Sequence, residues 1–113
     1  MKISFADKKL EKLANHDRKL VKKFGKIRAE KIKARLAQIS FATTLDDVRQ
    51  LPGNYHELTG NRKVQWSCDL DQPYRMVFTP HESPIPTNAF GQYIWLEITG
   101  IEVLEIINYH KEK

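Results

Sequence analysis

The spacing of the apolar residues changes at Pro52-Gly53, and this change constrains the fold more than any other feature of the sequence. Before it, apolar residues recur at the spacing of a helix, as at Ala29, Ile32, Leu36 and Ile39. After it, they alternate with polar residues, as at Val64, Trp66, Cys68 and Leu70. A helical half followed by a strand-rich half is typical of the α+β class. With 113 residues, the chain is expected to form one domain, residues 1–113.

Local signals predict where the individual elements begin and end. Residues 2–6 alternate like a short strand, and helices are expected to begin after Asp7, after Asp17 and at Lys26. Several prolines and a glycine predict a long irregular loop at 80–92. Antiparallel strands are expected at residues 55–58, 64–70, 74–79 and about 101–109.

Charge is distributed unevenly along the chain. Residues 1–50 carry 14 Lys and Arg against 6 Asp and Glu, whereas residues 51–113 carry 5 against 8. Three of the cations, Arg28, Lys31 and Arg35, form a stripe on the expected third helix. A basic half of this kind fits a polyanion or an acidic partner, and it fits equally a solvated, lysine-rich helix surface.

The cysteine content and the N-terminus bear on location. Cys68 is the single cysteine, so a disulfide within the chain is excluded, and its place in an alternating run predicts a small buried side chain. The N-terminus has no apolar signal segment, and no stretch approaches the length needed to span a membrane. We therefore expect a cytoplasmic protein without membrane contact.

Four side chains at or near the ends of the expected strands are candidates for chemistry: His56, Arg75, Tyr109 and His110. Arg75 should face away from the core side of its strand. If the last strand pairs inside the sheet, these four residues converge on one end or one face of it.

Such a group suits metal-free cleavage of RNA. This reaction needs a base near the 2′-hydroxyl, a cation at the phosphate and an acid for the leaving 5′-oxygen. Histidine can fill either proton role, arginine binds two phosphate oxygens at once, and tyrosine can stack on a base. The alternative is that each residue is an ordinary surface side chain. No metal or cofactor is expected, because the histidines are far apart in sequence: His16, His56, His81 and His110.

Several short motifs follow one another in a specific order: Leu-Pro-Gly at 51–53, Tyr-His-Glu-Leu-Thr-Gly-Asn-Arg at 55–62, Trp-Ser at 66–67, Tyr-Arg-Met-Val-Phe at 74–78 and Asn-Tyr-His at 108–110. In this order and spacing, the chain resembles HigB-type toxins of the RelE/ParE superfamily over nearly its whole length. These toxins are the plasmid-maintenance killer proteins of type II toxin–antitoxin pairs. The resemblance implies an α+β fold in which an N-terminal helical hairpin, here residues 7–40, packs on a small antiparallel sheet.

The resemblance also implies an activity and partners. Toxins of this type cleave messenger RNA on the ribosome without a metal, and a cognate antitoxin, here expected to be HigA-like with a helix-turn-helix fold, silences them. By analogy, His56 and His110 would transfer protons, Arg75 would bind the phosphate, and Tyr109 would orient or stack on a nucleotide. The side chains expected to hold RNA are polar or basic: Thr59, Arg62, Lys63, Asn108, Arg28, Lys31 and Arg35.

Two positions depart from the family pattern. A lysine that is frequent in the turn after the first histidine is Thr59 here, and the aspartate before the terminal tyrosine is Asn108. Arg62 or Lys63 would have to supply the lost cation. Because an amide cannot act as a carboxylate base, slower or altered nuclease activity is an alternative to full activity.

Two rival functions come from other classes. One is a ParE-like toxin that inhibits DNA gyrase and cleaves nothing, and the other is a decayed toxin retained mainly to bind its antitoxin. ParE-type chains usually lack the histidine pair, so His56 and His110 argue against the first rival. Thr59 and Asn108 keep the second open.

Overall fold

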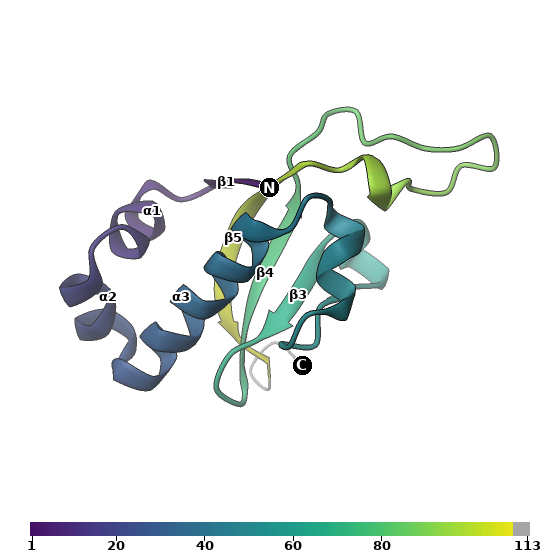
Figure 1. Ribbon diagram of the computed structural model, residues 1–113. Helices are drawn as coiled ribbons and strands as arrows, with labels where there is room; N and C mark the ends of the chain where they lie inside the picture. The colour runs from purple at the N-terminus through teal and green to yellow at the C-terminus, as the bar shows by residue number, and fades with distance from the viewer. Residues whose placement is uncertain (110–113) are drawn as a thin grey trace.

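The computed structural model describes residues 1–109, and within them five strands form one sheet with the order β1-β5-β4-β3-β2 (Figure 1). The strands are β1 (Lys2–Phe5), β2 (His56–Glu57), β3 (Trp66–Asp69), β4 (Tyr74–Pro80) and β5 (Gly100–Asn108). The α+β class predicted from the sequence is confirmed, and the last strand lies inside the sheet, between β1 and β4.

The sheet is mixed rather than entirely antiparallel. Strands β2 to β5 pair in antiparallel fashion, whereas β1 runs parallel to β5, with Lys2 opposite Gly100. A parallel neighbour needs a long connection, and here nearly the whole chain lies between the two strands. In the antiparallel part, Arg75 of β4 lies between Asp69 of β3 and Ile107 of β5.

Within the described residues, three α-helices begin at or close to the three predicted positions: α1 (Lys8–Ala14), α2 (Asp17–Phe24) and α3 (Lys26–Phe41). The helical hairpin that the resemblance implied is not confirmed. Asp7 caps α1 as predicted, because its carboxylate accepts a hydrogen bond from the Lys9 amide over 2.7 Å. The N-cap of α2 is His16 rather than the predicted Asp17. Gly25, with a φ of 87° that favours glycine, separates α2 from α3. No helix in residues 1–109 is long and apolar enough to cross a membrane.

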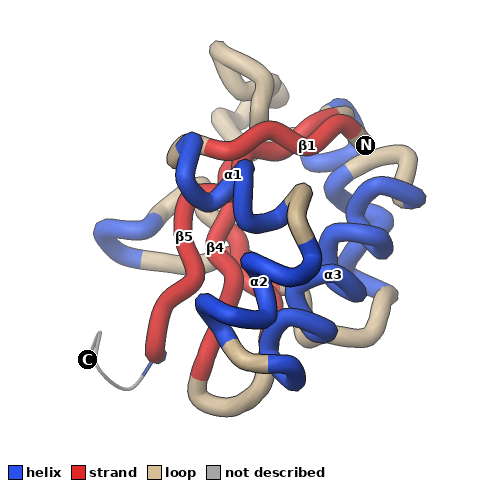
Figure 2. The backbone as a smooth tube through the Cα atoms, turned by 90° about the vertical axis from the view of Figure 1, so that its left-hand side faces the viewer, coloured by secondary structure: helices blue, strands red, loops and turns tan. Residues whose placement is uncertain are grey.

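The helices bury one face of the sheet, and α2 and α3 lie to one side of β4 and β5 (Figure 2). Among the helical residues, Leu10, Ala29, Ile32 and Ile39 are buried, and Leu13, Phe24 and Leu36 pack against them partly buried. On the sheet side, the core includes Trp66, Cys68, Met76 and Phe78. Burying each large side chain contributes roughly 1.5–3 kcal/mol. The residues that alternate with these core residues, such as Ser67, Arg75 and Val77, lie on the other face of the sheet, where the candidate site is found.

The segment between β4 and β5 is a long connection, as predicted, but part of it is ordered as a small hairpin. Thr87 and Tyr93 form a β-bridge, and the Ile94 amide donates to the Pro86 carbonyl over 3.0 Å. The short helix η3 (Trp95–Glu97) follows. The loop extends away from the sheet in Figure 1.

Candidate functional site

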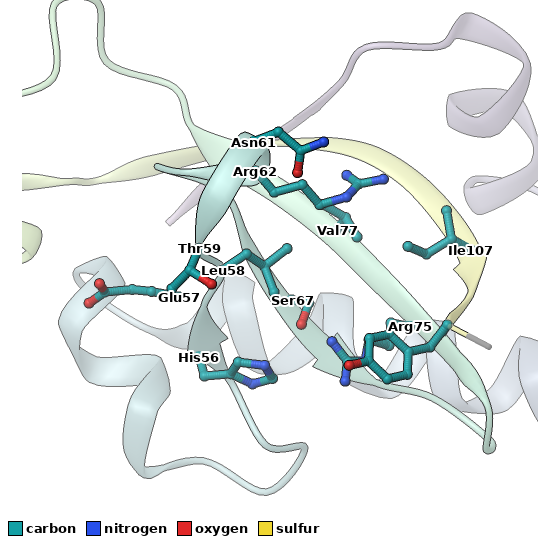
Figure 3. A pocket seen from close by; sticks show the side chains of 11 residues that line it. His56, Glu57, Leu58, Thr59, Asn61, Arg62, Ser67, Arg75, Val77 and Ile107 are labelled. Carbon is teal, nitrogen blue, oxygen red and sulfur yellow. The ribbon is translucent and has the colours of Figure 1, made fainter. Parts of the chain in front are cut away.

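A hollow of about 330 Å³ lies on the sheet face opposite the core (Figure 3). Side chains from β2 to β5 and from the turn after β2 line it. The lining residues are His56, Glu57, Leu58, Thr59, Asn61, Arg62, Ser67, Arg75, Val77, Ile107 and Tyr109. Three of the four side chains singled out from the sequence, His56, Arg75 and Tyr109, therefore meet in one place. The fourth, His110, lies outside the described residues.

Arg75 is held in the hollow by its neighbours. Its Cζ lies 3.5 Å from the centroid of the Tyr109 ring, which is cation–π geometry. Its Nε lies 4.0 Å from Asp69 Oδ1, and the side chain is 19% exposed. The Tyr109 amide donates to the Pro73 carbonyl over 2.8 Å, so the ring partner of Arg75 is itself fixed to the sheet. An arginine held in this way presents a pre-oriented cation to a phosphate.

His56 enters the same hollow from β2, with its ring pointing toward Arg75 (Figure 3). Its Nδ1 lies 2.7 Å from the Asn54 carbonyl oxygen. A carbonyl oxygen only accepts hydrogen bonds, so Nδ1 is assigned the proton in the neutral ring and Nε2 keeps its lone pair. That tautomer suits a base acting through Nε2.

Ser67 is a further polar residue of the hollow, and its role was not predicted from the sequence. It is 0% exposed, and its Oγ has no hydrogen-bond partner within the described residues. Its Cα pairs with His56 on one side and with Val77 on the other. A buried hydroxyl without a partner costs about 1–3 kcal/mol, so a ligand atom that bonded to it would recover this energy. The signal in the sequence is its alternation with the core residues Trp66 and Cys68.

Residues 3–90 match the model of a family described as the RelE-like toxin of the type II toxin–antitoxin system HigB. The chain belongs to this family. It is a type II toxin of the HigB/RelE kind, and such a toxin has an antitoxin as its partner.

The structure of the toxin is similar to that of a YoeB/ParE toxin from Agrobacterium tumefaciens, with a TM-score of 0.51 and 14% sequence identity. The similarity covers 94% of this chain and 96% of the other. At this identity it supports the RelE/ParE-like fold alone. No curated protein sequence matches the toxin.

The turn after β2 adds cations near the hollow. Arg62 lines it, and Arg62 Nη1 donates to Gln65 Oε1 over 2.8 Å and to Glu105 Oε2 over 3.3 Å. Thr59, which precedes the short helix η2 (Gly60–Arg62), is exposed and lines the hollow as well. Lys63 lines a neighbouring hollow instead. Arg62, rather than Lys63, therefore shares the hollow with His56 and Arg75 and is the better replacement for the lysine that the family carries at the position of Thr59.

Arginines beside the hollow are paired with carboxylates. Besides Arg62 with Glu105, Arg49 forms an ion pair with Glu57, which also lines the hollow. Arg49 comes from η1 (Leu45–Gln50), a short helix that follows α3. The hollow therefore carries fixed anions close to its cations.

None of the three helix cations lines the hollow. Arg28 makes a two-pronged ion pair with Asp71, with N–O distances of 2.9 and 3.0 Å, and its Cζ lies 3.4 Å from the Tyr74 ring centroid. Lys31 is exposed on α3. This geometry favours a role in packing for Arg28, and it leaves Lys31 accessible to a partner.

Arg35 is buried, with 9% of the residue exposed. Its Nε donates to the Asp69 carbonyl oxygen over 2.7 Å, and its Nη1 donates to the Pro52 carbonyl over 3.3 Å. The guanidinium thus joins α3 to two other segments of the chain. The structure favours this structural role over the predicted contact with RNA.

Asn108 is the last residue of β5 and pairs with Tyr74. It precedes Tyr109 directly, so it lies at the rim of the sheet beside the hollow. Within residues 1–109, no three His, Cys, Asp or Glu side chains are grouped closely enough to hold a metal ion.

Proposed function

We propose that the toxin is a metal-free endoribonuclease that cleaves messenger RNA on the ribosome and so inhibits translation. The observation that carries this proposal is the hollow in which Arg75, fixed against Tyr109, and His56, with Nε2 as an acceptor, face the same space. A cation and a base placed together on an open sheet face suit a phosphodiester with an adjacent hydroxyl.

In the proposed reaction, His56 Nε2 accepts the proton of a ribose 2′-hydroxyl. The 2′-oxygen attacks the adjacent phosphorus, and the bond from phosphorus to the 5′-oxygen breaks. The products are a 2′,3′-cyclic phosphate and a free 5′-hydroxyl, and His110 supplies the proton to the leaving oxygen. Arg75 stabilises the extra negative charge on the phosphate oxygens, and Tyr109 holds Arg75 and stacks on a nucleotide.

The neighbouring residues would hold the RNA. The Ser67 hydroxyl, buried without a partner at the floor of the hollow, would donate to a phosphate or ribose oxygen. The nucleotides on either side of the cleaved bond would be contacted by Arg62, Thr59 and Asn108. RNA farther from that bond would be contacted by the exposed Lys31 and Lys63. We further propose a single domain, a cytoplasmic location and a HigA-like antitoxin with a helix-turn-helix fold.

The experiment is primer extension on mRNA bound to programmed ribosomes, with and without a chelator. Arg75→Ala should reduce cleavage about 10²–10³-fold, as removal of one oxyanion donor does, and His56→Ala about 10²–10⁴-fold. Lys33→Ala, which removes an exposed cation of α3 that is paired with Asp17 and has no proposed contact with RNA, is the matched control and should cleave normally. Circular dichroism and antitoxin binding should be unchanged in all three variants.

Full cleavage by both Arg75→Ala and His56→Ala would overturn the proposed chemistry. Growth arrest by the wild-type toxin without RNA cleavage would favour the gyrase inhibitor. Expression without the antitoxin that leaves growth normal would favour the decayed toxin.

A further inference from the structure

A second hollow, of about 710 Å³, adjoins the first. Both are lined by the same short segment, Glu57, Leu58 and Thr59, so one strand of RNA can pass from one hollow into the other over this segment. The opposite wall of the second hollow comes from the hairpin of the long loop and from Trp95.

That hairpin is held in a defined shape. Asn88 Oδ1 accepts hydrogen bonds from the amides of Phe90 and Gln92 over 2.8 and 3.1 Å, and Asn88 Nδ2 donates to Gln92 Oε1 over 2.9 Å. Tyr93, which closes the hairpin by its bridge to Thr87, is thus fixed in position before any ligand binds.

A row of aromatic rings ties this wall to the core. The Tyr93 and Trp95 ring centroids are 5.2 Å apart, and Trp95 meets the buried Trp66 edge to face at 5.4 Å. Both Tyr93 and Trp95 remain partly exposed where they line the hollow. The second hollow therefore has a rigid aromatic wall.

The chemistry of the lining fits a nucleobase. Aromatic side chains that are partly exposed offer faces for stacking, and the Gln92 amide and the Lys63 ammonium offer donors to a base edge or a phosphate. Aromatic faces alternating with polar groups suit a splayed base better than the continuous apolar stripe of a protein helix.

We propose that the second hollow binds the base of a nucleotide next to the cleaved bond, with Tyr93 as the stacking surface, and so determines which mRNA sequences are cut. This inference rests on the proposed nuclease function. It assigns to the long loop a role in sequence preference that is separate from the proton-transfer residues.

The first experiment compares cleavage sites across many mRNAs on ribosomes for the wild type, Tyr93→Ala, Tyr93→Phe and Phe90→Ala. Phe90 is the matched control, because it is 88% exposed at the tip of the same hairpin and does not line the hollow. Tyr93→Ala should reduce the preference for favoured over disfavoured flanking bases, because the base is then no longer held against the Gln92 and Lys63 donors. The loss of one base stack, about 5- to 150-fold, is the upper limit of this reduction. Tyr93→Phe and Phe90→Ala should keep the wild-type preference. An unchanged preference in Tyr93→Ala would overturn the inference.

The second experiment reads out contact without cleavage. Arg75→Ala toxin is bound to ribosomes programmed with mRNA that carries 5-iodouridine at successive positions, irradiated and analysed by mass spectrometry. A crosslink between Tyr93 and a base beside the scissile position is expected. Crosslinks confined to other residues, while the wild type still cleaves, would overturn the base site and leave the nuclease intact. A Tyr93 crosslink with a wild type that cuts nothing would overturn the nuclease, and with it the role in sequence preference, and would leave only the base-binding site.

Discussion

Substitution of Arg35 tests whether this cation of α3 supports the fold or contacts RNA. In Arg35→Ala, the toxin loses the 2.7 Å bond to the Asp69 carbonyl and two longer bonds from Nη1, of 3.3 Å to Pro52 and 3.4 Å to Gln38. Hydrogen bonds from a charged donor stabilise by about 1.5–3 kcal/mol each. If the 2.7 Å bond is counted in full and the two longer bonds in part, the free energy of unfolding should fall by roughly 3 kcal/mol.

Urea unfolding followed by circular dichroism measures this loss. With a slope of about 2 kcal/mol per molar urea, the midpoint should fall by about 1.5 M. Lys31→Ala, exposed one turn earlier on the same helix, is the control and should stay within about 0.5 kcal/mol of the wild type. If Arg35→Ala unfolds like Lys31→Ala but binds ribosomes more weakly, Arg35 contacts RNA and the structural assignment is wrong.

Three further results are expected. Gly53→Ala should lower the melting temperature, because the new Cβ would lie 2.7 Å from Arg35 Nε at a φ of 126°, and an unchanged melting temperature would contradict this. Burial raises the pKa of the Cys68 thiol to about 12, so a thiol reagent at pH 8 should label it only after unfolding; rapid labelling of the native toxin would be the opposite result. Burial raises the pKa of the Glu82 carboxyl, but hydrogen bonds from the Thr99 amide and hydroxyl outweigh this effect, and the pKa is lowered overall. The ionised carboxylate therefore stabilises the fold near pH 7, and this stabilisation is lost as the pH falls through the lowered pKa. Glu82→Gln should therefore be less stable than the wild type at pH 7, and urea unfolding should show the gap closing below pH 4.5.

Sequence patterns predicted the elements better than the way they pair. Alternation correctly identified β3 and β4 and placed Arg75 on the face opposite the core. It overestimated β3, predicted from Val64 but beginning at Trp66, because Val64 adopts a φ of 82° at the end of a turn. It also gave no information on the parallel pairing of β1 with β5, since a strand's own pattern does not encode its partner.

The same distinction applies to the site. The meeting of His56, Arg75 and Tyr109 followed from their places at strand ends once the last strand lay inside the sheet. Ser67 was missed because a serine on the polar side of an alternating strand reads as solvated, whereas its neighbours bury it. The burial of Arg35 depends on backbone carbonyls that arrive from distant segments, which helical spacing cannot predict.

The fixed carboxylates beside the arginines have a consequence for how RNA binding responds to salt. When a phosphate takes over an arginine such as Arg62, the carboxylate it displaces, here Glu105, stays beside the RNA and retains a cation from solution. Each contact then releases fewer ions than it would from an unpaired arginine. The slope of log affinity against log salt should be shallower than a count of the cations around the hollow suggests, so that binding is less steeply weakened as the ionic strength rises.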